Sequence, residues 1–127
     1  MWGHAADDVY AVGVNGTLLH RGGGGWSEVE GAPRQLLREV WGPANDRSTV
    51  YVVGWDGLLM RVRGGPSFSR GAAVELAGCV TRNRLEALWG TLVAAPAPDG
   101  GGPADAGLPP VPKAWAVGVS GTLIVGP

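Results

Sequence analysis

Short apolar runs of about strand length alternate with turn-forming pairs along this chain. Residues 9–12 and 18–21 flank one such pair, and residues 50–53 and 58–62 flank the next. The pairs themselves are Asn15-Gly16, Asp56-Gly57 and Ser120-Gly121. Because Asn, Asp and Gly tolerate the positive φ angles of a type I′ turn, each pair predicts a tight antiparallel hairpin. Residues 50–53 show no polar–apolar alternation, which predicts a strand covered on both faces.

An ordered set of blocks occurs three times. Each copy has a Trp-Gly dipeptide, then an aromatic residue with an apolar run and a glycine, then the hairpin pair; the dipeptides are Trp2-Gly3, Trp41-Gly42 and Trp89-Gly90. Four strands in roughly 40 residues, joined by sequential hairpins, is the pattern of a β-propeller blade. The sequence therefore predicts an all-β partial β-propeller of about three four-stranded antiparallel blades, the third incomplete. We expect one propeller segment with blade-like units at about 1–40, 41–88 and 89–127.

Two segments complete this expected layout. Residues 36–41, which lead into the second Trp-Gly dipeptide, are expected to form the fourth strand of the first unit. Residues 92–113 include six Pro, four Gly and five Ala, a composition that favours neither helix nor strand. We expect a loop inserted in the third unit there. It is either a tolerated low-complexity expansion, since long loops cost little closure entropy, or a contact loop at the blade's inner-strand end.

The repeated tryptophans and glycines are assigned to packing between blades. Trp2, Trp41 and Trp89 are expected to contact the neighbouring blade, where the glycine after each permits close backbone approach. A similar role on the next strand is expected for Gly13, Gly54 and Gly118. Three units cannot close a ring, because propellers typically need four to eight blades, so the end blades would expose apolar faces. Either further blades of a longer chain, which we favour, or self-association would close the propeller.

The first unit resembles a known group of bacterial repeats. Its blocks Asp7-Asp8-Val9-Tyr10-Ala11-Val12-Gly13 and Asn15-Gly16-Thr17-Leu18-Leu19-His20, followed by Trp26, resemble the tryptophan-glycine "DVWAVG…NGT" repeats of bacterial β-propeller proteins. They are also similar to photosystem II assembly factor-like and Asp-box repeats, although glycines occupy positions 22–25, where an Asp-box carries its Asp. The resemblance extends over nearly all of the chain outside 92–113. It implies a propeller in an adhesin, an assembly factor, or a glycan-binding or glycan-hydrolysing domain, exported or on the cell surface.

Composition and charge exclude several classes of function. The chain has 127 residues, 45% hydrophobic and 17% charged, with a net charge of −1. It can build a core, and it offers no basic face for nucleic acid. No apolar run approaches the roughly 18 residues of a membrane span, and Met1-Trp2-Gly3 opens no signal peptide. The single Cys79 can form neither an internal disulfide nor a metal site, and is expected to be a small buried hydrophobe.

The repeats provide an internal control for candidate catalytic residues. His20 occupies the same slot as Arg61 and Val125, and a slot that accepts all three predicts a tolerant surface position. Asp7-Asp8 is interpreted as a pair of turn-forming side chains that bond to local backbone. His4 has no partner at metal-ligand spacing and is expected in a surface loop.

Known catalytic and cofactor motifs are missing from the sequence. Ser120 lacks the glycine two residues later that a nucleophile elbow requires. The glycines at 22–25 have no Lys-Ser/Thr pair after them, so they form no phosphate-binding loop. We therefore predict no catalytic residue, no metal site and no cofactor.

Two arginines are the one candidate binding feature. Arg61 and Arg63 should share one face of a strand, with Met60 and Val62 on the other. The sequence leaves two interpretations open. The pair either belongs to a solvated face with Glu75 and Glu86 as counter-charges, or it contacts an anionic ligand such as an acidic glycan or an acidic protein patch.

These features favour a non-catalytic binding or scaffolding propeller module of a larger bacterial, exported protein. Its expected partners are a protein or glycan surface, without nucleic acid or membrane insertion. The alternatives are a glycan-acting propeller enzyme of the sialidase or glycoside-hydrolase type, which would need converging carboxylates, and an assembly factor for another protein complex.

Overall fold

Three antiparallel sheets make up the structure, a computed structural model that describes residues 1–64, 73–79, 81–93 and 111–126. In each sheet the strands pair in sequence order. The first sheet holds β1 (Trp2–Ala5), β2 (Asp8–Val12), β3 (Leu18–Gly22) and β4 (Gly25–Glu28). The second holds β5 (Leu37–Trp41), β6 (Thr49–Gly54), β7 (Leu58–Arg63) and β8 (Ala73–Cys79). The third holds β9 (Leu85–Val93), β10 (Val111–Gly118) and β11 (Leu123–Gly126). The all-β prediction is confirmed.

The three predicted hairpin turns are also confirmed. Asn15, Asp56 and Ser120 have φ angles of 54°, 55° and 58°, and the glycine after each also has a positive φ. These are the two central residues of a type I′ turn. In the first turn the Thr17 N–H donates to the Val14 carbonyl at 3.0 Å. The same tight connection therefore joins β2 to β3, β6 to β7, and β10 to β11.

The expectation that residues 36–41 form the fourth strand of the first unit is wrong. Val40 of β5 pairs with Val52 of β6, in the second sheet, and the first sheet ends at β4. The segment between β4 and β5 contains Gly31, with a φ of 97°, and Pro33. A positive φ at Gly31 and the fixed φ of Pro33 are typical of a chain that changes direction, and the next strand begins a new sheet.

The expected loop at 92–113 is shorter than the sequence indicates. Leu92 and Val93 end β9, and β10 already begins at residue 111, so that Pro112 pairs with Leu92. Pairing between β10 and β11 extends only to Ala114. Pro112 therefore lies where β10 has a neighbour on one side only, a position that proline tolerates. Residues 94–110 lie outside the described residues.

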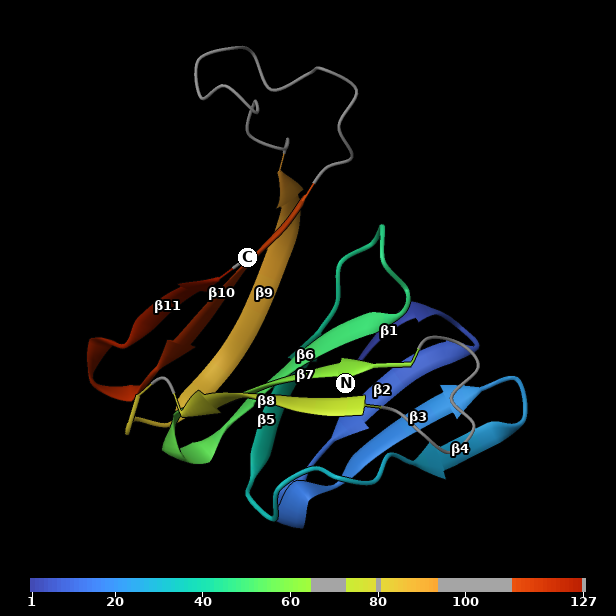
Figure 1. Ribbon diagram of the computed structural model, residues 1–127, viewed down its shortest axis with the longest axis horizontal. Helices are drawn as coiled ribbons and strands as arrows, with labels where there is room; N and C mark the ends of the chain where they lie inside the picture. Colours follow the sequence, from blue (N-terminus) through green and yellow to red (C-terminus); the bar gives the residue numbers. More distant parts are fainter. Residues whose placement is uncertain (65–72, 80, 94–110, 127) are drawn as a thin grey trace.

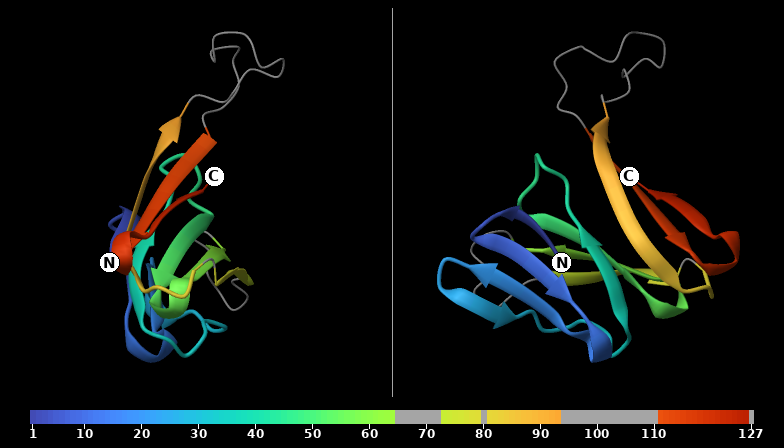
Figure 2. Two further views of the ribbon diagram at one scale, coloured as in Figure 1. Left: turned by 90° about the vertical axis from the view of Figure 1, so that its left-hand side faces the viewer. Right: turned by 180° about the vertical axis from the view of Figure 1, so that it is seen from behind.

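The second sheet lies between the first and the third, and the three sheets spread as an open fan (Figures 1 and 2). One core fills the first interface, around Tyr10, Leu18 and Val52. A second core fills the other interface, around Val53 and Leu88. The middle sheet is thus covered on both faces, which confirms the prediction for residues 50–53. None of the helical turns within the described ranges is long and apolar enough to cross a membrane.

Candidate functional site

A tryptophan of one sheet contacts a glycine of the next sheet at both interfaces. A Cβ atom on Gly42 would lie 2.9 Å from the Trp2 ring, and one on Gly90 would lie 2.5 Å from the Trp41 ring. Neither position can hold a larger side chain unless the ring moves. The predicted role of Trp2 and Trp41 in packing between sheets is therefore confirmed. We call each interface between neighbouring sheets, with its tryptophan-on-glycine contact, a joint. The first joint lies between the first and second sheets, and the second joint lies between the second and third sheets.

Strand pairing places equivalent side chains on the same face of every sheet. We call the face with the tryptophan the leading face and the opposite one the receiving face. The leading faces carry Trp2, Tyr10 and Leu18 in the first sheet, Trp41, Tyr51 and Leu59 in the second, and Trp89, Trp115 and Leu123 in the third.

The leading face of the third sheet is open to solvent. Leu18 is 0% exposed in the first joint, whereas the equivalent Leu123 is 60% exposed. Trp89 is 47% exposed and stacks on Trp115 of its own sheet, with ring centroids 6.1 Å apart. The ammonium group of Lys113 lies 5.9 Å from the Trp115 ring. The described residues therefore hold no neighbouring-sheet partner for Trp89, and its aromatic surface is available for binding.

Two glycines of the next strand also permit close backbone approach. A Cβ on Gly54 would overlap the Leu36 carbonyl, and one on Gly118 would overlap the Arg84 carbonyl. These carbonyls accept hydrogen bonds from the residue after each glycine, at 3.0 and 3.1 Å. At Gly13 the nearest atom would be 3.8 Å away, an ordinary contact. Gly54 pairs with Leu37 and Gly118 with Leu85, so both carbonyls lie just before the neighbouring strand of the same sheet. Close backbone approach is thus found at two of the three positions, but within a sheet, and the expected role between blades is not confirmed for these glycines.

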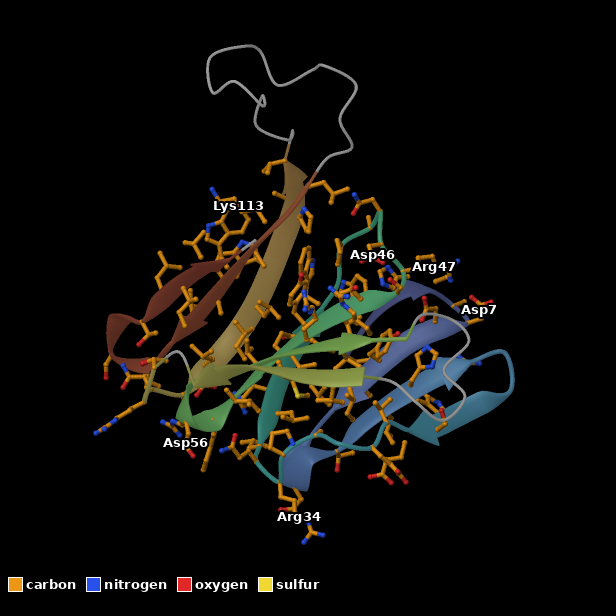
Figure 3. All side chains as sticks on the ribbon, viewed as in Figure 1. Asp7, Arg34, Asp46, Arg47, Asp56 and Lys113 are labelled. Carbon is orange, nitrogen blue, oxygen red and sulfur yellow. The ribbon has the colours of Figure 1, made fainter. Side chains whose placement is uncertain are left out.

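A charged cluster with a buried centre lies at the interface between the first and second sheets. Asp8 is 0% exposed and His20 is 1% exposed, and His20 Nε2 donates to Asp8 Oδ1 at 2.8 Å. Arg47, from the loop between β5 and β6, donates its Nε to Asp8 Oδ2 at 3.3 Å. Its Nη2 lies 3.8 Å from Asp7 Oδ1. Figure 3 shows Asp7, Asp46 and Arg47 at the same end of the molecule, opposite Asp56 and Arg34.

The predictions for His20 and Asp8 are wrong. The slot of His20 does recur at Arg61 and Val125, but its surroundings differ from sheet to sheet. The second sheet covers His20, whereas Val125 is 53% exposed on the open leading face. Asp8 is the first residue of β2 rather than a turn residue. Its two carboxylate oxygens bind His20 and Arg47, which offsets the cost of burying the charge. Only Asp7 lies in the turn.

His4 of β1 lies beside this cluster, in a strand rather than in the predicted surface loop. Its ring meets Trp2 edge-on, with centroids 4.3 Å apart. Its Nε2 is buried and has no hydrogen-bond partner among the described residues. Burial lowers the pKa of His4, although the carboxylates of Asp8 and Asp46 oppose the shift. Burial likewise raises the pKa of Tyr10. Both shifts follow from an interface that excludes water.

Stability is expected to fall as the pH drops from neutral through 6.5. The folded pKa of His4 is below 6.5, so the unfolded chain binds a proton there that the folded chain does not. The stability contributed by the neutral ring is complete above pH 6.5 and is lost as the pH falls through that value toward the folded pKa. Urea unfolding at a series of pH values measures the effect. His4→Asn should flatten this part of the profile, and an unchanged profile in the variant would contradict the assignment.

Arg61 and Arg63 share one face of β7, as predicted, with Met60 and Val62 fully buried on the other. Arg61 is half-buried and pairs with Glu75 of β8 in the strand register, whereas Arg63 is exposed and pairs with Ala73. The register thus places an acidic position opposite Arg61. The anionic-ligand contact of these arginines stays a prediction.

The remaining sequence candidates add no further site. Cys79 ends β8 and its backbone pairs with Leu58, but its side chain lies outside what the structure describes. Within the described ranges, no group of three or more His, Cys, Asp or Glu side chains could hold a metal ion.

Comparisons with known proteins identify no relative. No family model, no curated protein and no solved structure matches the chain. Its function is therefore inferred from two features of the molecule itself, the repeated joint and the open leading face.

Proposed function

We propose that the chain is a non-catalytic binding and scaffolding module, a segment of an open β-propeller that binds through the leading face of its third sheet. The observation that carries the proposal is the repetition of the joint. The leading faces of the first two sheets are each covered by the next sheet, and the same face of the third is open. Large exposed apolar patches on folded proteins mark interaction surfaces.

The propeller architecture has three supports. The strands of each sheet follow one another as a meander, neighbouring sheets pack face to face around apolar cores, and the same joint connects both pairs of sheets. A propeller blade is likewise a four-stranded meander that packs between two neighbours. Apolar cores hold the sheets of such an array together. The surfaces that lie outside these cores are therefore free to bind a protein or a glycan.

A glycan-acting enzyme is less well supported. Glycoside hydrolysis requires two carboxyl groups about 5–10 Å apart on either side of the scissile bond. Asp8 has both oxygens bound to His20 and Arg47 inside the interface. Asp46 accepts hydrogen bonds from Ser48, and Glu86 pairs with Arg38 of the second sheet at 2.6 Å. These contacts favour structural roles for the three carboxylates. An assembly factor would use the same open face, with a protein intermediate as its ligand.

Trp89→Ser is expected to weaken binding to a macromolecular partner about tenfold or more, because exposed aromatic anchors dominate the energetics of interfaces. Biolayer interferometry against neutral and acidic polysaccharides, together with light scattering for self-association, measures the effect. Trp55→Ser is the matched control, because Trp55 is 41% exposed in a turn outside this face. Binding that is unchanged in Trp89→Ser, or hydrolysis of any of these polysaccharides, would contradict the proposal.

A further inference from the structure

We infer that the open leading face of the third sheet binds the receiving face of the first sheet in a second copy of this chain. This inference rests on the proposed function and names the partner of its binding surface. The contact would repeat the internal joint, with Trp89 over Gly3 of the second copy. Two copies contain about six sheets, which lies within the four to eight blades of closed propellers.

The receiving face of the first sheet has the composition that the joint requires. Gly3 pairs with Val9, and Ala11 pairs with Leu19, so these four residues share that face. The equivalent residues of the second sheet are Gly42, Val50, Val52 and Met60, and those of the third are Gly90, Ala114, Ala116 and Ile124. Both of these other faces lie inside joints. In the first sheet Gly3 is exposed and its three apolar neighbours are only half-buried.

Charge also matches across the proposed contact. Between the first and second sheets, Asp8 of the first sheet accepts a hydrogen bond from Arg47. Arg47 lies in the loop after the Trp-Gly dipeptide of the second sheet. The third sheet has Lys113 at the position equivalent to Asp8, and Lys113 is exposed. In the first sheet the turn after the Trp-Gly dipeptide carries Asp7, whose side chain is 73% exposed and whose Oδ1 lies 3.8 Å from Arg47 Nη2 of the same copy. In the internal contact the first-named sheet supplies the acid and the second the base. In the proposed contact Lys113 of one copy supplies the base and Asp7 of the other copy supplies the acid, so the two charges are again opposite.

A contact between copies should be weaker than an internal joint. In the first two sheets the turn glycines Gly16 and Gly57 lie against the carbonyls of Pro33 and Thr81. Both carbonyls belong to segments that run on to the next sheet of the same chain. At the equivalent Gly121, no atom lies within 4 Å of an added Cβ. Because a second copy replaces the sheet but not the connecting segment, the association is expected to be reversible and to depend on concentration.

The test measures the mass of the full chain by light scattering after size-exclusion chromatography, over a range of concentrations. The wild type should form a dimer, and Trp89→Ser should raise its dissociation constant about tenfold or more. Trp55→Ser should behave as the wild type. Leu123→Arg, at a position that is 60% exposed, is a second leading-face variant that leaves the stacked tryptophans in place. Circular dichroism confirms that each variant folds.

A charge exchange distinguishes this contact from other modes of association. Asp7→Lys and Lys113→Asp should each weaken the dimer about threefold, because each places like charges together at an exposed position. The double variant D7K/K113D should recover the wild-type dissociation constant, since the two charges are again opposite.

Three outcomes would overturn the inference. An Asp7→Lys variant with the wild-type dissociation constant would mean that the turn carrying Asp7 is not part of the contact. A double variant weaker than both single variants would mean that Asp7 and Lys113 do not meet. A wild type that remains monomeric at every concentration would remove the second copy as the partner. In that last case, polysaccharide binding that depends on Trp89 would still uphold the proposed function.

Discussion

His20→Leu is expected to reduce the free energy of unfolding by about 3–5 kcal/mol. Leucine is similar in volume to histidine, so the expected loss comes from charge and hydrogen bonding rather than from a cavity. The substitution removes the Nε2 donor 2.8 Å from Asp8 Oδ1. Among the described residues, the fully buried Asp8 carboxylate would keep Arg47 as its side-chain partner. Urea unfolding followed by tryptophan fluorescence measures the change.

A second substitution separates the buried charge from a general loss of packing. Asp8→Val in the His20→Leu background should recover a large part of the lost stability, because an apolar pair leaves no unpaired charge inside the interface. Arg38→Leu is the matched control. Its ion pair with Glu86 also joins two sheets, but both side chains are at least one-third exposed, so its loss should cost at most about 1 kcal/mol. A double variant less stable than His20→Leu would contradict this account.

Trp41→Ala is expected to cost about 3 kcal/mol, because its ring fills the space over Gly90 and packs against the second core. Trp89→Ala is the matched control at the equivalent position of the third sheet. Since Trp89 is 47% exposed and contacts no further sheet in the described residues, its loss should cost less than about 1 kcal/mol. Thermal and urea unfolding of the two variants, at concentrations low enough that the chain is monomeric, measure the difference. Equal losses of stability in the two variants would contradict the claim that the Trp41 ring packs between two sheets.

Gly90→Ala tests the same joint from the opposite side. The added Cβ would lie 2.5 Å from the Trp41 ring and 2.6 Å from the Lys113 carbonyl, so about 1–3 kcal/mol should be lost. In the Trp41→Ala background the loss should be smaller, because only the carbonyl contact remains. At Gly3 the equivalent contact, 2.9 Å from the Asp8 carbonyl, occurs without a ring in the monomer. Gly3→Ala, measured at concentrations where the chain is monomeric, is therefore the baseline. Strictly additive effects of the two substitutions would mean that the residues do not touch.

The local turns and the tryptophan–glycine contacts could be predicted from the sequence, because each depends on a few residues in fixed order. A type I′ turn requires positive φ at two positions, and Asn15-Gly16 supplies it within the hairpin. Glycine after tryptophan indicates close approach, although the sequence does not say which sheet supplies the ring. The structure shows that the ring comes from the preceding sheet, as Trp41 does for Gly90.

The burial of His20 could not be predicted by comparing the three repeats. Equivalent slots share a backbone conformation, but burial depends on whether a further sheet covers the slot, which is a long-range property. Residues 8, 10 and 12 alternate along β2 on one face, and the hairpin register places His20 opposite Tyr10. This register could have indicated the buried pair from the sequence, because it places the His20 imidazole close to the Asp8 carboxylate on an otherwise apolar face.

The assignment of residues 36–41 failed for a related reason. A strand that follows a meander can either extend the same sheet or begin a new one, and the hydrophobic pattern is the same in both cases. Gly31, with a positive φ, and Pro33 lie in the segment before β5, but residues 81–84, before β9, begin a new sheet without either residue type.

The most direct test of the joint, on which both the fold and the binding proposal depend, is a nuclear Overhauser measurement on the isotope-labelled chain. The account predicts cross-peaks from the Trp2 ring to the Gly42 Hα protons and from the Trp41 ring to the Gly90 Hα protons. In dilute solution the Trp89 ring should show cross-peaks to Trp115 and to no glycine of another sheet. Tryptophan rings with cross-peaks only to residues of their own sheets would show that the sheets do not stack in this way, and would contradict the account.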